Sequence, residues 1–106
     1  MFSEALNENN KTTEALGYLN QVRTRAGVPV YSNLTKDDTR EKIYLERRLE
    51  LSFEGHRWFD LVRTGRAYNV MQPYGMQSYM TVFPVPHSQV QIINDNTIFP
   101  QNTGYN

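Results

Sequence analysis

One helix-start signal, followed by a long helical repeat, constrains this chain more than any other feature. Thr35 precedes Lys36-Asp37-Asp38, so its hydroxyl can cap a helix whose third position is acidic, a variant of the capping box. Asp37 and Asp38 also complement the positive end of the helix dipole. We therefore predict a helix that begins directly after Thr35.

This helical pattern continues to Glu54 and, past Gly55, toward Arg63. Glycine inside a helix costs roughly 1 kcal/mol relative to alanine. We therefore expect either a kink at Gly55 or another backbone that passes close to it. Thr64-Gly65 ends the pattern, because glycine readily takes the left-handed conformation that follows a helix.

An earlier helix is predicted from about Thr13 to Ala26, with Thr12 or Thr13 as its N-cap. Its apolar residues recur at helical spacing in one narrow stripe, formed by Ala15, Leu19, Val22 and Ala26. Gly27 ends this helix and Pro29 prevents its resumption.

On a helical wheel, the residues from position 44 onward form two adjoining apolar arcs and one charged side. The arcs contain Leu45, Leu49, Phe53 and Phe59, and Tyr44, Leu51, Trp58 and Val62. A helix with two apolar arcs is enclosed by neighbours over most of its circumference. Arg48 and Arg63 fall within these arcs, so we expect Arg48 to be buried and to need carboxylate or carbonyl partners.

The charged residues of the same stretch allow two interpretations. Glu46 and Glu50, or Glu50 and Glu54, lie one helical turn apart, near the ~5–5.5 Å carboxyl spacing of retaining glycosidases. The nearby arginines favour ionised carboxylates, however, whereas a general acid must be protonated. We therefore predict no catalytic residue and a structural ion-pair network of Glu46, Arg47, Arg48, Glu50, Glu54, Arg57, Asp60 and Arg63.

The last third of the chain has weaker helical signals. We predict a helical turn at residues 66–71, an irregular loop at 72–81, an extended segment at 82–86, a short helix at 87–93 and a loop-rich tail. The extended segment follows from Pro84 and Pro86, because proline disfavours α geometry in the residue before it. In the short helix, Val90 and Ile93 should face inward.

Three tyrosines of this region, Tyr68, Tyr74 and Tyr79, are candidate ligand contacts. They alternate with methionines and with amide side chains. Aromatic rings can stack on the C–H faces of a sugar while amides bond its hydroxyls, so the composition suits a glycan. The same composition also suits a protein interface, or packing against a further part of a larger protein.

Composition and charge exclude several functional classes. Eleven basic and eleven acidic side chains leave no positive excess that would attract nucleic acid. Cysteine is absent, and His56 and His87 lack partners at metal-ligand spacing, so we predict no metal and no cofactor. No apolar run approaches the ~20 residues that span a membrane, and the N-terminus lacks a signal-peptide pattern. An export signal would therefore lie outside this segment.

Four stretches resemble motifs of the SusD/RagB family, in the same order and spacing. They are Ala15–Gly27, the run Glu46–Gly65 that contains Glu54-Gly55-His56-Arg57-Trp58-Phe59-Asp60, Phe83-Pro84-Val85-Pro86, and Gln101-Asn102-Thr103-Gly104-Tyr105, where Thr103 replaces the usual proline. The resemblance covers nearly the whole chain. Because family members are several times longer, it implies that residues 1–106 are a single unit, a C-terminal segment of such a protein.

The resemblance implies a mainly α, SusD-like helical fold of tetratricopeptide-like helix pairs with long irregular C-terminal loops. It also implies a non-catalytic lipoprotein at the extracellular face of the outer membrane, with its lipid anchor outside this segment. Such a protein binds an oligosaccharide or other nutrient and works with a SusC-like TonB-dependent transporter in polysaccharide uptake. Its ligand contacts come largely from variable loops, many of them outside this segment.

A helical-repeat scaffold that binds protein is the alternative that the residues leave open. One pair of helices with a stripe of small residues fits such a repeat. The proline pair and the tyrosine-rich loop favour the first interpretation, because solenoids rarely end so irregularly.

Overall fold

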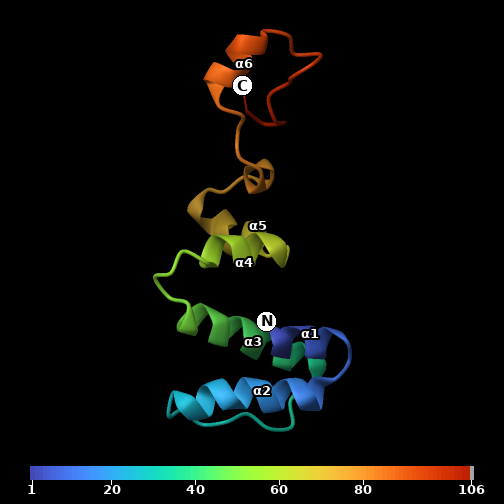
Figure 1. Ribbon diagram of the computed structural model, residues 1–106, viewed down its shortest axis with the longest axis vertical. Helices are drawn as coiled ribbons and strands as arrows, with labels where there is room; N and C mark the ends of the chain where they lie inside the picture. Colours follow the sequence, from blue (N-terminus) through green and yellow to red (C-terminus); the bar gives the residue numbers. More distant parts are fainter. Residues whose placement is uncertain (106) are drawn as a thin grey trace. The chain divides into compact units, whose positions relative to one another are not determined.

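The computed structural model describes residues 1–105 of the chain. All regular elements in this range are helical and none is a strand (Figure 1), which confirms the mainly α prediction. None of the described helices combines the length and the apolar character that a membrane span requires. The chain divides into two compact units, Met1–His56 and Arg57–Asn106. A single unit of residues 1–106 stays a prediction.

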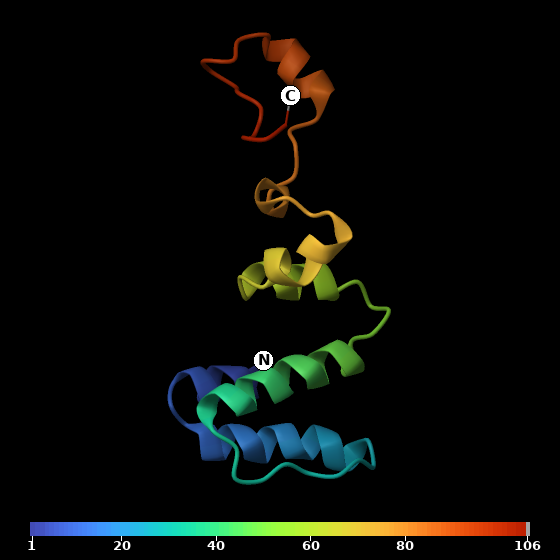
Figure 2. The same ribbon diagram turned by 180° about the vertical axis from the view of Figure 1, so that it is seen from behind.

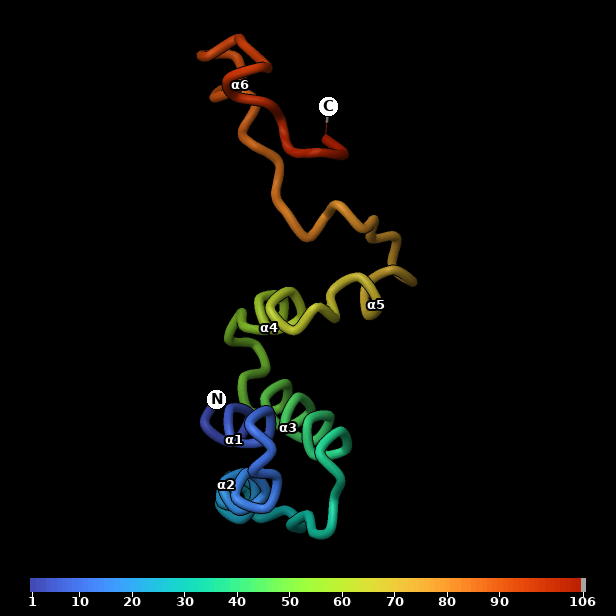
Figure 3. The backbone as a smooth tube through the Cα atoms, turned by 90° about the vertical axis from the view of Figure 1, so that its right-hand side faces the viewer, coloured from blue at the N-terminus to red at the C-terminus, as the bar shows by residue number. Residues whose placement is uncertain are grey.

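Three mutually contacting helices make up the first unit: α1 (Phe2–Glu8), α2 (Thr12–Arg25) and α3 (Lys36–Glu50). α1 and α2 form an antiparallel hairpin, whereas α3 runs parallel to α2 (Figures 1 and 2). The parallel arrangement arises because residues 26–35 return along α2 before α3 begins. Viewed along α2 in Figure 3, the three helices lie at the corners of a triangle.

Burial along α2 follows the predicted stripe at first and departs from it at the end. Ala15 and Leu19 are buried and Val22 is half-buried. Ala26 lies beyond the last helical residue and is exposed. Gly27 follows in the left-handed region at φ +70°, so the predicted stop signal is confirmed.

The start of α2 and the whole of α1 differ from the sequence expectation. Lys11 occupies the N-cap position without a side-chain cap bond, while Thr12 donates to Asn7 Oδ1 at 3.0 Å, so the threonine N-cap prediction is wrong. The sequence does not predict α1, because seven residues without a capping bond carry little helical signal. Tertiary contacts hold α1: the fully buried Asn7 donates to the Lys36 carbonyl at 2.9 Å.

The start of α3 is as predicted. The Thr35 hydroxyl accepts a hydrogen bond from the Asp38 amide at 3.1 Å and donates to the Asp38 carboxylate at 2.7 Å. This pair of bonds satisfies one of the free amides of the first turn and fixes the helix entry. The helix ends at Glu50, however, so its predicted extension to Glu54 is wrong.

A turn at residues 51–55 replaces the expected continuation. Phe53 and Gly55 take left-handed backbone at φ +66° and +76°. The Ser52 hydroxyl donates to the Arg48 carbonyl at 2.6 Å, a local bond that competes with helix continuation. Among residues 1–105, no atom beyond the chain neighbours of Gly55 lies within 4 Å of where a Cβ at this position would be. Gly55 therefore marks neither a helix kink nor a close backbone contact. Its role is to allow the positive φ that this turn requires.

The burial predicted from the helical wheel is wrong for the first apolar arc. Leu45, Leu49, Phe53 and Phe59 are all exposed, and so is Arg48, which was expected inside. The reason is that α3 buries one face only, through Thr39, Ile43 and Glu46. The second arc is half-buried.

The second unit consists of short elements: α4 (Arg57–Arg63), α5 (Ala67–Met71), the 3₁₀ turns η1 (Gln72–Tyr74) and η2 (Ser78–Thr81), and α6 (His87–Ile93). Its core is small: Leu61, Ala67 and Met76 are buried, and Trp58, Val62, Val70, Met71 and Met80 pack against them. The helical turn near 66–71 and the short helix at 87–93 are confirmed. Val90 is half-buried, but Ile93 is 46% exposed and does not face inward.

Candidate functional site

The three candidate tyrosines lie on consecutive short elements of the second unit. Tyr68 is on α5, Tyr74 on η1 and Tyr79 on η2. Tyr74 is 81% exposed and Tyr68 is 38% exposed, whereas Tyr79 is half-buried. Within residues 1–105, none of their hydroxyls has a hydrogen-bond partner.

The residues between these tyrosines separate into an inner and an outer side. Met76 is buried, and Met71 and Met80 are half-buried against the core of the unit. The exposed amides and the three tyrosines form what we call the tyrosine surface: Tyr68, Asn69, Gln72, Tyr74, Gln77 and Tyr79. The alternation of tyrosine and methionine thus separates a polar aromatic exterior from an apolar support.

The C-terminal strap, Gln101–Tyr105, is bonded side chain to backbone onto the extended segment 82–86. The Gln101 amide accepts from the Val85 N–H at 2.7 Å and donates to the Val85 carbonyl at 2.8 Å. Asn102 donates to the Phe83 carbonyl at 2.7 Å, and the Tyr105 hydroxyl donates to the Val82 carbonyl at 2.9 Å. The proline-containing segment 82–86 and the strap therefore lie in contact. Neither stretch of sequence, taken alone, predicts this contact.

The strap also contacts the tyrosine surface. The Tyr79 and Tyr105 rings pack edge to face, with centroids 5.0 Å apart. Gly104, at φ +92°, lies directly against the Tyr79 ring: a Cβ at position 104 would be 2.3 Å from Tyr79 Cγ. Only glycine fits this position without moving the ring.

In the first unit, two of the predicted carboxylates pair with arginines of α2 that the sequence did not single out as their partners. Glu46, only 6% exposed, meets Arg23 of α2, with 2.5 Å between Oε2 and Nη1. Arg23 Nε also donates to the Pro29 carbonyl at 2.6 Å, and its guanidinium lies 4.0 Å from the centre of the Tyr31 ring. Glu50 pairs in the same way with Arg25. Both pairs join α2 to α3, and Arg23 also holds residues 26–35, which return along α2.

The other members of the predicted network are distributed over both units. Asp60 pairs with Arg63 on α4, with 3.1 Å between Oδ1 and Nε. Arg47 and Arg57 each have an interaction partner, whereas Arg48 and Glu54 are exposed. The structure thus brings Glu46 and Glu50 together with α2, and the network as a whole stays a prediction.

The ends of α1 and α3 are joined by a further ion pair. Arg40 donates from Nε and Nη2 to the two carboxylate oxygens of Glu8, at 2.6 and 2.8 Å, and from Nη1 to Asp37 at 2.5 Å. The hydrogen bond from Arg40 holds the pKa of Glu8 below its ordinary value. The same carboxylates raise the pKa of the Arg40 guanidinium.

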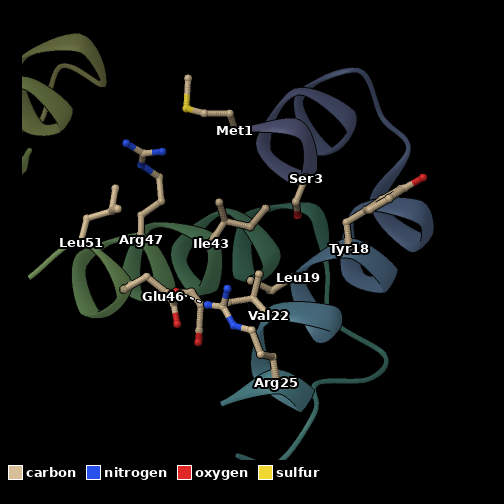
Figure 4. A pocket seen from close by; sticks show the side chains of 11 residues that line it. Met1, Ser3, Tyr18, Leu19, Val22, Arg25, Ile43, Glu46, Arg47 and Leu51 are labelled. Atoms are coloured by element: carbon tan, nitrogen blue, oxygen red, sulfur yellow. Dashed lines mark hydrogen bonds and ion pairs between the residues drawn. The ribbon is translucent and has the colours of Figure 1, made fainter.

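A pocket of about 220 Å³ lies among α1, α2 and α3 (Figure 4). Its apolar lining includes Leu19, Val22 and Ile43, and the Arg25–Glu50 ion pair is part of its wall. Each charged side chain that lines it has a partner in the protein. Among residues 1–105, no three histidine, cysteine, aspartate or glutamate side chains are placed to hold a metal ion.

Fold and surface together define a helical segment whose irregular C-terminal part exposes tyrosines. The chain belongs to the SusD family, whose model matches residues 1–105. It is 36% identical to SusD-like protein P38 and 30% identical to SusD-like protein P2, both of Formosa agariphila, each over 97% of its length. It spans only 22% and 23% of these two relatives.

A crystal structure of a SusD-like protein from Bacteroides fragilis has the same fold. It matches 97% of this chain with a TM-score of 0.78 and 24% sequence identity, and the match covers 23% of that protein. The SusD-like fold predicted from the sequence is therefore confirmed for this segment.

Proposed function

We propose that this chain is part of a non-catalytic SusD-type protein that binds a glycan or other nutrient at the extracellular face of the outer membrane. A SusC-like TonB-dependent transporter would receive that nutrient for uptake. Membership of the SusD family supports the general role. The tyrosine surface supports a ligand contact within this segment, because none of its three tyrosine hydroxyls has a hydrogen-bond partner among residues 1–105.

The geometry of the carboxylates supports a role without catalysis. A glycosidase needs two carboxyl groups that face a substrate, one of them protonated. Glu46 and Glu50 instead each bond an arginine of α2. We therefore assign the first unit a scaffold role.

Affinity electrophoresis tests the binding role directly. The chain would be run through gels that contain starch, xylan, laminarin, alginate or mannan, beside the variants Tyr74→Ala and Tyr18→Ala. We expect one polysaccharide to retard the wild type, and Tyr74→Ala to weaken that binding about fivefold, as for an aromatic contact worth ~1 kcal/mol. Tyr18, a 44% exposed tyrosine of the first unit, is the matched control and should have no effect. Equal retardation of all three proteins would place the contact outside the tyrosine surface.

A further inference from the structure

The strap ends against one member of the tyrosine surface, and this contact suggests a role beyond holding the tail. We propose that Gly104 and Tyr105 are positioning residues that fix the Tyr79 ring in the orientation in which a ligand meets it. This inference rests on the proposed binding function. It concerns residues that do not themselves touch the ligand.

Tyr79 needs such support because its own element is weak. It lies on η2, a 3₁₀ turn of four residues, and short 3₁₀ turns have poor hydrogen-bond geometry. In an ordinary half-buried tyrosine the hydroxyl bonds the protein and fixes the ring. Within residues 1–105 the Tyr79 hydroxyl makes no such bond. The ring is therefore held from its sides and its polar end is left free.

The strap supplies the missing contact with little freedom of its own. A Cβ on residue 104 would be 2.3, 2.5 and 2.7 Å from Tyr79 Cγ, Cδ2 and Cδ1. These distances mean that the Gly104 backbone lies across the root of the ring, in contact with its face. Tyr105 adds an edge-to-face ring contact at 88° between the planes.

The strap is in turn anchored next to η2, through residues that follow it directly. The Tyr105 hydroxyl bonds the carbonyl of Val82, the residue after η2. Gln101 holds both the N–H and the carbonyl of Val85. Pro84 and Pro86 keep this segment extended. The distance from strap to ring is therefore fixed by four side-chain hydrogen bonds rather than by a helix or sheet.

The test compares variants of the 106-residue chain for affinity, fold and ring exposure. Affinity is measured by affinity electrophoresis in the polysaccharide that retards the wild type. The fold is checked by near-ultraviolet circular dichroism and thermal unfolding. Exposure of Tyr79 is followed by nitration with tetranitromethane and mass spectrometry. Gly104→Ala should raise the nitration rate of Tyr79 and weaken binding about fivefold. Thr103→Ala, an exposed neighbour, is the matched control and should change neither.

A second pair of variants keeps the inference testable if Gly104→Ala unfolds. Tyr105→Phe keeps the ring and loses the hydroxyl, whereas Tyr105→Ala loses both. We expect Tyr105→Phe, which loses one of the four anchoring hydrogen bonds, to weaken binding less than Tyr105→Ala, and Tyr105→Ala to bind as weakly as Gly104→Ala. A freed Tyr79 with unchanged affinity, or unchanged affinity in Tyr105→Ala, would overturn the positioning role and leave the binding function intact. If no polysaccharide binds the wild-type chain, the tyrosine surface is not a ligand contact, and the positioning role fails with it.

Discussion

The two units use side chains for opposite purposes. In the first, the three helices satisfy most of their own backbone groups, and side chains such as Arg23 and Glu46 join one helix to another. In the second, the extended segment 82–86 pairs with no strand among residues 1–105. The side chains of the strap bond its backbone directly instead. The first unit should therefore be sensitive to unpaired charge, and the second to the loss of single amide or hydroxyl groups.

The largest effect is expected from Glu46→Ala in the first unit. Removing this carboxylate leaves Arg23, whose side chain is only 11% exposed, without its charge partner. Breaking a buried pair from one side costs about 3 kcal/mol of unfolding free energy. Urea unfolding followed by far-ultraviolet circular dichroism measures this loss of unfolding free energy. Glu50→Ala is the control and should cost far less, because its partner Arg25 is 68% exposed; equal losses would contradict this account.

The second unit can be tested through Gln101→Ala. The substitution leaves the N–H and the carbonyl of Val85 without their partners, which costs about 2 kcal/mol for half-buried polar groups. Hydrogen exchange at the Val85 amide should accelerate accordingly. Gln91→Ala on the exposed side of α6 should leave that amide unchanged. If Val85 keeps its protection in Gln101→Ala, the strap does not hold this segment.

A smaller effect separates a true helix cap from an apparent one. Thr35→Ala removes the hydroxyl that accepts from the Asp38 amide, and should lower the unfolding free energy by ~1 kcal/mol. Thr13→Ala changes a residue that looks like a cap in the sequence but lies inside α2, and should have little effect. Thermal unfolding of both variants checks the difference. A larger loss for Thr13→Ala would reverse our assignment of the caps.

The smallest effect concerns the Glu8–Arg40 pair. Because the pKa of Glu8 is lower in the folded chain than its ordinary 4.5, the pair stabilises the fold above that pH. Its contribution is lost as the pH falls through the lower folded pKa. Acid titration of Glu8→Gln beside the wild type should show a difference at neutral pH that vanishes in acid. If the wild type stays more stable than Glu8→Gln at the lowest pH, the charge of Glu8 is not the origin of the stability difference.

The same contrast explains what the sequence could predict. The Thr35 cap and the stops at Gly27 and Gly65 depend on local chemistry, and the structure confirms them. The end of α3 could not be predicted from local chemistry, because the turn after it needs a positive φ at Phe53, which this residue type disfavours. Likewise, no local pattern selects Arg23 as the partner of Glu46, since that choice depends on how α2 and α3 pack.

The candidate site, too, has a part that the sequence predicts and a part that depends on tertiary packing. The sequence identifies Tyr68, Tyr74 and Tyr79 by composition, but composition does not reveal that Tyr74 is open and Tyr79 is braced. The brace comes from Gly104, more than twenty positions later in the chain. A single sequence contains no signal for such a distant contact between a glycine and a ring.

The return of the chain along α2 has length to spare. With 14 residues, α2 is about 21 Å long at ~1.5 Å per residue. Residues 26–35 run back over that length, and at ~3.3 Å per residue they reach about 33 Å when fully extended. The return path therefore exceeds the helix by about 12 Å, more than the ~5.4 Å of one helical turn. An insertion of one turn in α2 should be accommodated by straightening residues 26–35, without a second insertion on the path back.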